Sequence, residues 1–140
     1  MSDVPRRPAR RGSVAVILRN QALLVIRRAE GISAPGKYCF PGGGIERNET
    51  EEQALVRELR EELSIAVTPV RRLWRSKTQW GIDLAWWLAD LAEDAQPIAN
   101  PAEVQSIHWF TVEQLELLDG LLDSNREFLQ VLRADRSLAI

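Results

Sequence analysis

Residues 43–65 read GGIERNETEEQALVRELREELSI and carry the longest helical signal in the chain. Thr50 with Gln53 three positions later forms a capping box, which is typical of the start of a helix. Beyond this box, apolar residues recur at helical spacing and define one buried face. The pattern therefore predicts a helix over residues 51–63. Its apolar face consists of Val56, Leu59 and Leu63.

Three glutamates share one face of this predicted helix. Glu58, Glu61 and Glu62 stand at positions i, i+3 and i+4, so their side chains lie one turn apart. Like charges repel, but a hard divalent cation such as Mg²⁺ or Mn²⁺ reverses the interaction because it prefers carboxylate oxygens. Arg57 adds a guanidinium that can orient a carboxylate through two hydrogen bonds. By itself, such a pattern is more often a solvated helix face.

The segment before the helix favours the metal interpretation. Pro41 gives a rigid entry, and the three glycines at 42–44 are free to adopt positive φ. We expect a loop there that brings backbone groups close to a bound ion or phosphate. Glu46 and Glu49 add two further carboxylates before the helix begins.

This stretch resembles the Nudix box, G-x5-E-x7-R-E-U-x-E-E-x-G-U, in which U is a bulky aliphatic residue. The departure is Ser64, where the family has glycine. We expect Ser64 to keep the left-handed conformation at the helix end, at a cost of about 1 kcal/mol. Asn48 replaces a frequent glycine and tolerates the same conformation. Eight of the nine defined positions agree: Gly43, Glu49, Arg57, Glu58, Leu59, Glu61, Glu62 and Ile65.

The resemblance implies an α/β fold, the Nudix-type α/β/α sandwich with a mixed central sheet and a smaller antiparallel sheet. It also implies hydrolysis of a nucleoside diphosphate linked to a further group, with Mg²⁺ as cofactor and Mn²⁺ as a substitute. The three helix glutamates would ligate the metal, with the Gly43 carbonyl as a further ligand. Glu49 and Arg57 would form a supporting pair that holds the loop to the helix, with Gly44 also supporting it. The implied catalytic set within the box is Arg57, Glu58, Glu61 and Glu62.

Four residues outside the box resemble substrate and metal contacts of MutT-type triphosphate pyrophosphohydrolases. Arg28 precedes Phe40 at the spacing of a substrate-binding arginine, and both are candidate substrate contacts. Glu103 resembles an extra metal ligand or catalytic base, and Asn125 resembles a residue that reads a purine edge. Each has a structural alternative: an exposed strand-end arginine, a solvated glutamate, or an asparagine that serves the backbone of a first helical turn.

These matches favour a MutT-like nucleoside triphosphate hydrolase, with oxidised nucleotides as a candidate substrate. Hydrolysis of ADP-ribose, a dinucleoside polyphosphate or another nucleotide conjugate is the alternative. Two rivals belong to other classes: a non-catalytic nucleotide sensor, and an isomerase on the same fold. The sensor class usually loses box glutamates, which this chain keeps, and Cys39 is a poor isomerase nucleophile beside Phe40.

Composition limits the partners. The 18 basic and 20 acidic residues leave a formal charge of -2, which gives no electrostatic reason to expect duplex nucleic acid. The single cysteine, Cys39, excludes an internal disulfide and suits a reducing cytoplasm. We expect no membrane span, a flexible basic tail over 1–12, and one domain over 13–140, acting as a monomer or homodimer.

The rest of the chain predicts mixed strands and helices. Strands over 13–18 and 23–26 suggest a hairpin with a polar turn. Further strands are expected over 38–40, 65–75, 82–91 and 107–110. Capping boxes that begin at Thr111 and Ser124 predict a short helix ended by Gly120 and a final helix to Arg133. Trp86 and Trp87 should face opposite sides of one strand, so one of them is a candidate base-stacking residue, whereas His108 and Cys39 are expected to be packed.

Overall fold

Strand β1 (Arg11–Val16) organises the first of two sheets in the computed structural model. It pairs antiparallel with β5 (Gly42–Gly44) and parallel with β7 (Asp83–Leu91). Strand β6 (Val67–Lys77) completes this four-stranded sheet antiparallel to β7. The sheet is therefore mixed, as the family resemblance implied. The structure describes residues 10–135, 138 and 140.

The second sheet is antiparallel and is built around β3 (Ala22–Arg28). Strands β2 (Leu18–Arg19) and β4 (Tyr38–Cys39) pair with opposite ends of β3, and β8 (Val104–Phe110) pairs along its length. This sheet matters for function because Arg28 and Val104 are paired across it, which brings the residue before Val104 to the end of β3.

The predicted hairpin between residues 13–18 and 23–26 is wrong for most of its first segment. β1 belongs to the first sheet, and the chain changes sheets at the buried Ile17. Only β2 folds back on β3, through a turn in which Asn20 and Gln21 have φ of 49° and 66°. The sequence could not distinguish the two arrangements because both segments are buried on both faces and show no alternation.

Helix α1 (Glu51–Leu63) has the predicted bounds and the predicted Thr50 capping box. Helix α2 (Val112–Glu116) begins with the predicted Thr111 capping box, but the prediction that it ends at Gly120 is wrong. It ends at Glu116, and Gly120, with φ of 87°, lies in the turn that follows. The third predicted capping box is wrong. Helix α3 (Asp123–Ala134) has Leu122 at its N-cap, without a side-chain cap hydrogen bond. The Ser124 hydroxyl instead accepts a hydrogen bond from Asn125 Nδ2.

The predicted glycine loop is also wrong in part. Residues Gly42–Gly44 form strand β5, and only Gly42 adopts positive φ, at 154°. A side chain at position 42 would place its Cβ 2.2 Å from the Ser13 carbonyl oxygen. Gly42 is thus required by the close approach of β1, which a sequence pattern does not reveal.

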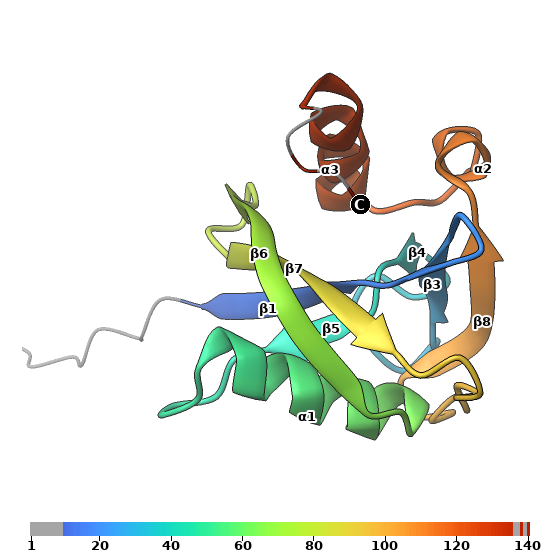
Figure 1. The fold of residues 1–140 in the computed structure, drawn as a ribbon. Coiled ribbons are helices and arrows are strands. Elements are labelled where there is room, and N and C mark those ends of the chain that lie inside the picture. The colour runs from blue at the N-terminus through green and yellow to red at the C-terminus, as the bar shows by residue number, and fades with distance from the viewer. Residues whose placement is uncertain (1–9, 136–137, 139) are drawn as a thin grey trace, which may run out of the picture.

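Helix α1 lies on one side of the first sheet, and α2 and α3 lie on the other (Figure 1). Two apolar cores result, and β7 contributes to both because its successive side chains face opposite sides. Trp86 is fully buried with Phe128 of α3, and the two rings stack 4.7 Å apart. Trp87 packs in the core beneath α1. The opposite orientation of the two tryptophans is confirmed.

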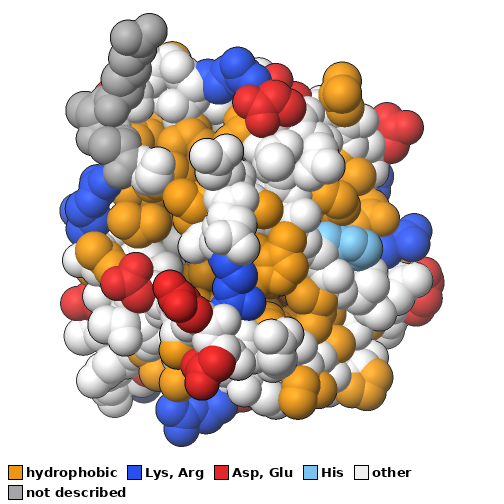
Figure 2. Space-filling view, turned by 45° about the vertical axis from the view of Figure 1, so that its right-hand side comes forward, with side chains coloured by type: hydrophobic (Ala, Val, Ile, Leu, Met, Phe, Trp, Pro, Cys, Tyr) orange, Lys and Arg blue, Asp and Glu red, His pale blue; other side chains and the backbone are white. Residues whose placement is uncertain are grey.

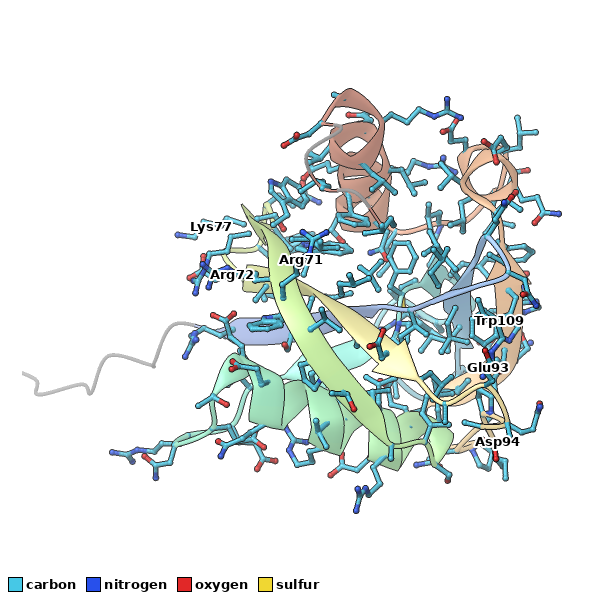
Figure 3. The ribbon with its side chains drawn as sticks, in the orientation of Figure 1. Arg71, Arg72, Lys77, Glu93, Asp94 and Trp109 are labelled. Carbon is cyan, nitrogen blue, oxygen red and sulfur yellow. The ribbon has the colours of Figure 1, made fainter. Side chains whose placement is uncertain are left out.

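A buried carboxylate ties the start of α1 to the first sheet. Glu51 is surrounded by arginines of β1 and β6: Arg75 hydrogen-bonds to Oε2, and nitrogens of Arg72 and Arg11 lie 3.5 and 3.6 Å from its oxygens. The Trp87 indole N–H donates to Oε1 at 2.9 Å. Figure 3 shows Arg71, Arg72 and Lys77 along β6 at the edge of this sheet. No pattern in the sequence predicts this cluster, because its members come from three distant segments.

Charged side chains of both signs lie on the surface of the protein. Acidic and basic side chains are intermixed over the face shown in Figure 2, in keeping with the nearly balanced composition. Within the described residues, no helix is long and apolar enough to cross a bilayer. The predicted tail falls largely on residues 1–9, which lie outside the described residues, whereas β1 already begins at Arg11.

Candidate active site

The end of Glu58 lies directly over Gly43. Helix α1 places this half-buried side chain against β5, where a Cβ on residue 43 would come 2.3 Å from Glu58 Cδ and 2.4 and 2.6 Å from its two oxygens. Only glycine leaves room for the carboxylate at this point. Burial raises the pKa of Glu58, an effect that the neighbouring Arg57 opposes. The box glycine and the box glutamate are therefore a matched pair.

Glu62 is the most deeply buried of the box glutamates, with 6% of its surface exposed. Its Oε1 accepts a hydrogen bond of 2.9 Å from the Gly42 N–H, which fixes the carboxylate against the start of β5. Burial raises the pKa of Glu62 to about 8, although the hydrogen bond from Gly42 acts in the opposite direction. A carboxylate held in such a place gains strongly from a nearby cation.

Arg57 joins the loop to the helix. Its guanidinium donates from Nε to Glu49 Oε2 at 2.7 Å and from Nη2 to Glu49 Oε1 at 2.8 Å. The same group donates to Glu58 Oε1 at 2.9 Å, to Glu61 Oε2 at 3.3 Å and to the Gly44 carbonyl at 2.8 Å. The supporting pair expected between Glu49 and Arg57 is present, and Gly44 takes part through its backbone.

This ion pair makes a prediction about acid stability. The hydrogen bonds from Arg57 lower the pKa of Glu49 from its ordinary 4.5 to about 2. A lowered folded-state pKa stabilises the protein above the unfolded value, and this stability is lost as pH falls from about 4.5 to about 2. Urea unfolding across that window should show a smaller loss of unfolding free energy in Glu49→Gln than in the wild-type protein. Glu52→Gln, a change at an exposed residue of α1, should lose as much unfolding free energy across this pH window as the wild-type protein does. An equal loss in the wild-type protein and both variants would contradict the prediction.

Glu103 approaches the box glutamates from a different part of the chain. It precedes β8, and its backbone carbonyl accepts a hydrogen bond of 3.0 Å from the N–H of Ala29, at the end of β3. Its charge contributes to the raised pKa of both Glu58 and Glu62, so the three carboxylates lie near one another. Glu103 Oε2 is buried, and the described residues offer it no hydrogen-bond partner. A bound ion or water would satisfy this oxygen.

The donor set fits a hard divalent cation. Glu58, Glu62 and Glu103 present carboxylate oxygens, which Mg²⁺ and Mn²⁺ prefer. Among the described residues, however, no three acidic, histidine or cysteine side chains already form a complete metal site. Arg57 binds one oxygen each of Glu58 and Glu61, and the Glu61 side chain is 50% exposed.

Arg28 lies at the edge of the same group. Its Nε donates to the Ser33 carbonyl at 2.7 Å and one terminal nitrogen donates to the Ser33 hydroxyl at 2.8 Å, so the loop after β3 orients the guanidinium. The charge of Arg28 also lowers the pKa of Glu62. The neighbouring Cys39 is buried, as expected, and burial raises the pKa of its thiol to about 11. An oriented cation beside the carboxylates suits a phosphate group.

Phe40 and Asn125 lie on the other side of the sheets: Asn125 belongs to α3, and Phe40 lies in the core beneath that helix. The Phe40 ring is buried and makes edge contacts with Trp86 and Phe128, at centroid distances of 6.0 and 5.7 Å. Asn125 is buried, and its Oδ1 accepts a hydrogen bond of 2.8 Å from the Phe40 N–H. Both residues therefore have a structural role here, and substrate contact by either stays a prediction.

The expected left-handed residues are confirmed. Ser64 has φ 54° and ψ 36° at the C-cap of α1, and Asn48 has φ 71° in the loop before it. His108 is packed as expected, stacked on Phe110 at 5.2 Å with the Tyr38 ring edge-on at 5.4 Å. Trp80 is largely exposed in the turn between β6 and β7, so it is not part of either core.

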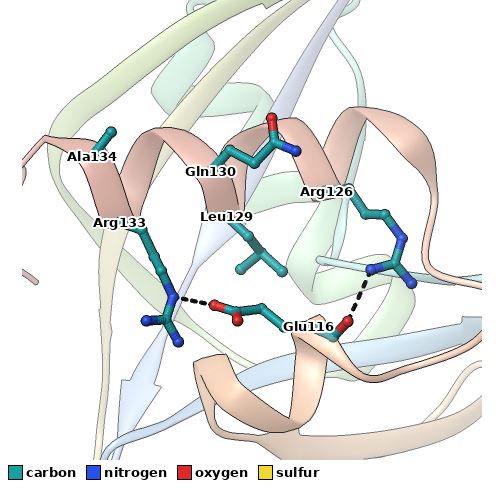
Figure 4. A pocket seen from close by; sticks show the side chains of 6 residues that line it. All are labelled: Glu116, Arg126, Leu129, Gln130, Arg133 and Ala134. Carbon is teal, nitrogen blue, oxygen red and sulfur yellow. Dashed lines mark hydrogen bonds and ion pairs between the residues drawn. The ribbon is translucent and has the colours of Figure 1, made fainter.

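A surface groove of about 530 Å³ lies elsewhere, between α2 and α3 (Figure 4). An ion pair between Arg133 and Glu116 crosses it, and Arg126 donates to the Glu116 carbonyl. None of the residues that line it belongs to the box, so the groove is separate from the carboxylate site. These residues are Glu116, Arg126, Leu129, Gln130, Arg133 and Ala134.

Known proteins are similar to this chain in sequence. The nucleoside triphosphatase NudI of Enterobacter sp. (strain 638) is 31% identical over 117 residues, which cover 74% of this chain and 83% of that protein. The 8-oxo-dGTP diphosphatase of Escherichia coli (strain K12) is 49% identical over 51 residues, or 35% of this chain and 40% of that protein. The chain spans less than two thirds of the length of most curated relatives that it matches.

Structural similarity covers almost the whole chain. The solution structure of the E. coli ORF135 protein matches with a TM-score of 0.74 at 25% identity, covering 93% of this chain and 92% of that one. The NUDIX domain model matches residues 9–132. The matched region includes both sheets, α1 and the glutamates described above. The chain therefore belongs to the NUDIX domain family and is a Nudix hydrolase.

Proposed function

We propose that this protein hydrolyses a phosphoanhydride bond in a nucleoside triphosphate or another nucleoside diphosphate-linked compound, with Mg²⁺ as cofactor and Mn²⁺ as a substitute. The observation that carries the proposal is the convergence of Glu103 on Glu58 and Glu62, with a buried Glu103 oxygen that has no partner among the described residues. The approach of two chain segments that far apart in sequence is not expected of a merely solvated helix face.

The residues of the carboxylate site divide into metal ligands and residues that position them or bind the substrate. Glu58, Glu61, Glu62 and Glu103 would hold the cation, with the Gly43 carbonyl as a further ligand. When bound, the cation lowers the pKa of a water and neutralises charge on the bridging oxygen. The Gly42 N–H orients Glu62, and Arg57 holds the loop in place. Arg28 would bind a phosphate oxygen.

The proposed reaction is the attack of water on a phosphorus atom of the phosphoanhydride. The oxygen of water forms a new bond to phosphorus, the bond from that phosphorus to the bridging oxygen breaks, and the released proton passes to a carboxylate. Any of the four glutamates is eligible as the base, since each lies at or near the carboxylate site.

The candidate substrate class is a nucleoside triphosphate, including oxidised forms. The relatives named as a nucleoside triphosphatase and as an 8-oxo-dGTP diphosphatase support this assignment, as do the positions of Arg28 and Glu103. In this proposal Asn125 and Phe40 contact the base, and the Asn125 amide binds it through the lone pair and the N–H that its bonds to the Phe40 N–H and the Ser124 hydroxyl do not use.

These two bonds favour a second candidate. Asn125 is buried, its Oδ1 already accepts from the Phe40 N–H and its Nδ2 already donates to the Ser124 hydroxyl, so a purine edge would share these atoms with bonds inside the protein. A nucleotide conjugate such as ADP-ribose or a dinucleoside polyphosphate needs less base recognition, because its second group supplies binding energy.

We also propose that the protein works on small molecules in the cytoplasm, as a monomer or homodimer.

A substrate panel tests the proposal. The purified chain is incubated with Mg²⁺ and nucleoside triphosphates, 8-oxo-dGTP, ADP-ribose or dinucleoside polyphosphates, and the phosphate products are identified. We expect metal-dependent turnover that EDTA abolishes and added Mg²⁺ or Mn²⁺ restores. Pyrophosphate release would support the triphosphate class, and turnover of conjugates alone would support the second candidate. No metal-dependent product from any compound would overturn the proposed function.

A further inference from the structure

Helix α1 ends in a way that connects it to the loop before β8. The last carbonyls of any helix lack partners within the helix. Here three of them are used by this loop: Leu63 O accepts from Ile98 N at 2.8 Å, and Glu62 O accepts from Asn100 N at 2.8 Å. Glu61 O accepts from the Asn100 side-chain amide at 3.3 Å. One residue, Asn100, therefore binds the backbone of two box glutamates.

Asn100 also shapes the turn that carries Glu103. Its main-chain carbonyl accepts hydrogen bonds from Glu103 N at 3.0 Å and from Val104 N at 2.8 Å. Its side-chain Oδ1 accepts from Ala102 N at 3.1 Å. Pro101, which follows, has a fixed φ and no N–H, so the turn has few alternative conformations. Val104 is buried, which anchors the far end of the turn in the core.

Asn100 is thus bonded to both sides of the carboxylate site at once. On one side it contacts the backbone of Glu61 and Glu62, and on the other it contacts the backbone of Glu103. The backbone of Glu103 is held at both its N–H and its carbonyl. The N–H donates to the Asn100 carbonyl, and the carbonyl accepts from Ala29 N at 3.0 Å. The Asn100 bonds therefore link the backbone of Glu103 to that of the helix glutamates.

We propose that Asn100 is a positioning residue, which sets the Glu103 carboxylate against the glutamates of α1 by bonding to the backbones of both segments. The proposal rests on the proposed function, because the carboxylate site is what Asn100 positions. It concerns no contact between Asn100 and substrate or metal.

Asn100→Ala tests the proposal, because it removes the two side-chain bonds and keeps the main-chain ones. We expect the affinity for Mn²⁺, measured without substrate by the electron paramagnetic resonance signal of the free ion, to fall roughly tenfold. We expect kcat/KM to fall by a similar factor. Gln96→Ala, at an exposed residue of the same loop, is the matched control and should match the wild-type protein in both measurements. Wild-type values in Asn100→Ala would overturn the proposal.

A double-mutant cycle with Glu103→Gln distinguishes positioning from a general loss of stability. If Asn100 acts through Glu103, then Asn100→Ala should have little further effect on Mn²⁺ affinity or kcat/KM when Glu103 is already glutamine. An equal tenfold loss in both backgrounds would overturn the proposal. If the wild-type protein binds Mn²⁺ but hydrolyses no compound, the function fails while the Mn²⁺ cycle still decides the role of Asn100. If it binds no Mn²⁺, both proposals fail.

Discussion

Glu62→Gln should lower kcat by roughly 100- to 1,000-fold at saturating Mg²⁺ while the protein stays folded. Glutamine keeps the shape of the side chain and an oxygen that accepts from the Gly42 N–H, but it removes the charge that would bind the cation. Because Glu62 is buried, the neutral amide should not lower the free energy of unfolding at neutral pH and is expected to raise it. Steady-state kinetics and urea unfolding together measure both effects.

The neighbouring Glu61 provides a comparison. Glu61→Gln should cause a similar loss of kcat, but it should leave the free energy of unfolding nearly unchanged, because the side chain is half exposed. Glu52→Gln, at an exposed position on the same helix, should retain wild-type turnover. Near wild-type kcat in both Glu61→Gln and Glu62→Gln would contradict the assignment of these carboxylates to the metal.

Gly43→Ala is expected to have the second largest effect. The new Cβ would lie 2.3–2.6 Å from the carboxyl atoms of Glu58, which is too close for both groups. The atoms that it meets are the end of a flexible side chain, so Glu58 moves away and the strand survives. We expect kcat/KM to fall roughly 100-fold, since catalytic groups tolerate little displacement. The free energy of unfolding should fall by about 1–3 kcal/mol, as in other overpacked sites.

The matched control is Gly31→Ala. An added Cβ at position 31 meets no atom within 4 Å, so this change should leave kcat/KM and the free energy of unfolding close to wild type. If Gly43→Ala behaved like Gly31→Ala, the close packing of Glu58 over β5 would have no catalytic importance. Loss of folding in Gly43→Ala would show instead that the strand cannot release the strain through Glu58.

The features predicted well from the sequence are those set by neighbours along the chain. Helix α1 was predicted to the residue because its capping box, its apolar spacing and the residue that follows it all act locally. The Glu49–Arg57 pair was expected because the box motif specifies it, and the left-handed Ser64 because its position in that motif is normally a glycine. Such interactions depend on spacing, which a sequence displays directly.

The features that were missed depend on contacts between distant segments. The change of sheet at Ile17 was not visible, because a strand buried on both faces looks alike in either sheet. Asn100 gave no signal, since its role requires the end of α1 to meet the start of β8. The start of α3 was placed two residues late because Ser124 resembled a cap, whereas the backbone N–H groups of Asn125 and Arg126 bond to the Leu122 carbonyl.

The burial of Glu51 has a consequence for how the molecule opens. Fraying usually begins at helix ends, where few bonds must break. Here, loosening the first turn of α1 would separate an anion from guanidinium groups of β1 and β6 and from the indole of Trp87. The helix that carries the glutamates is therefore held at its start by the ion pairs of Glu51 and at its end by hydrogen bonds to the loop before β8. Hydrogen exchange in α1 should accordingly require cooperative opening together with the mixed sheet.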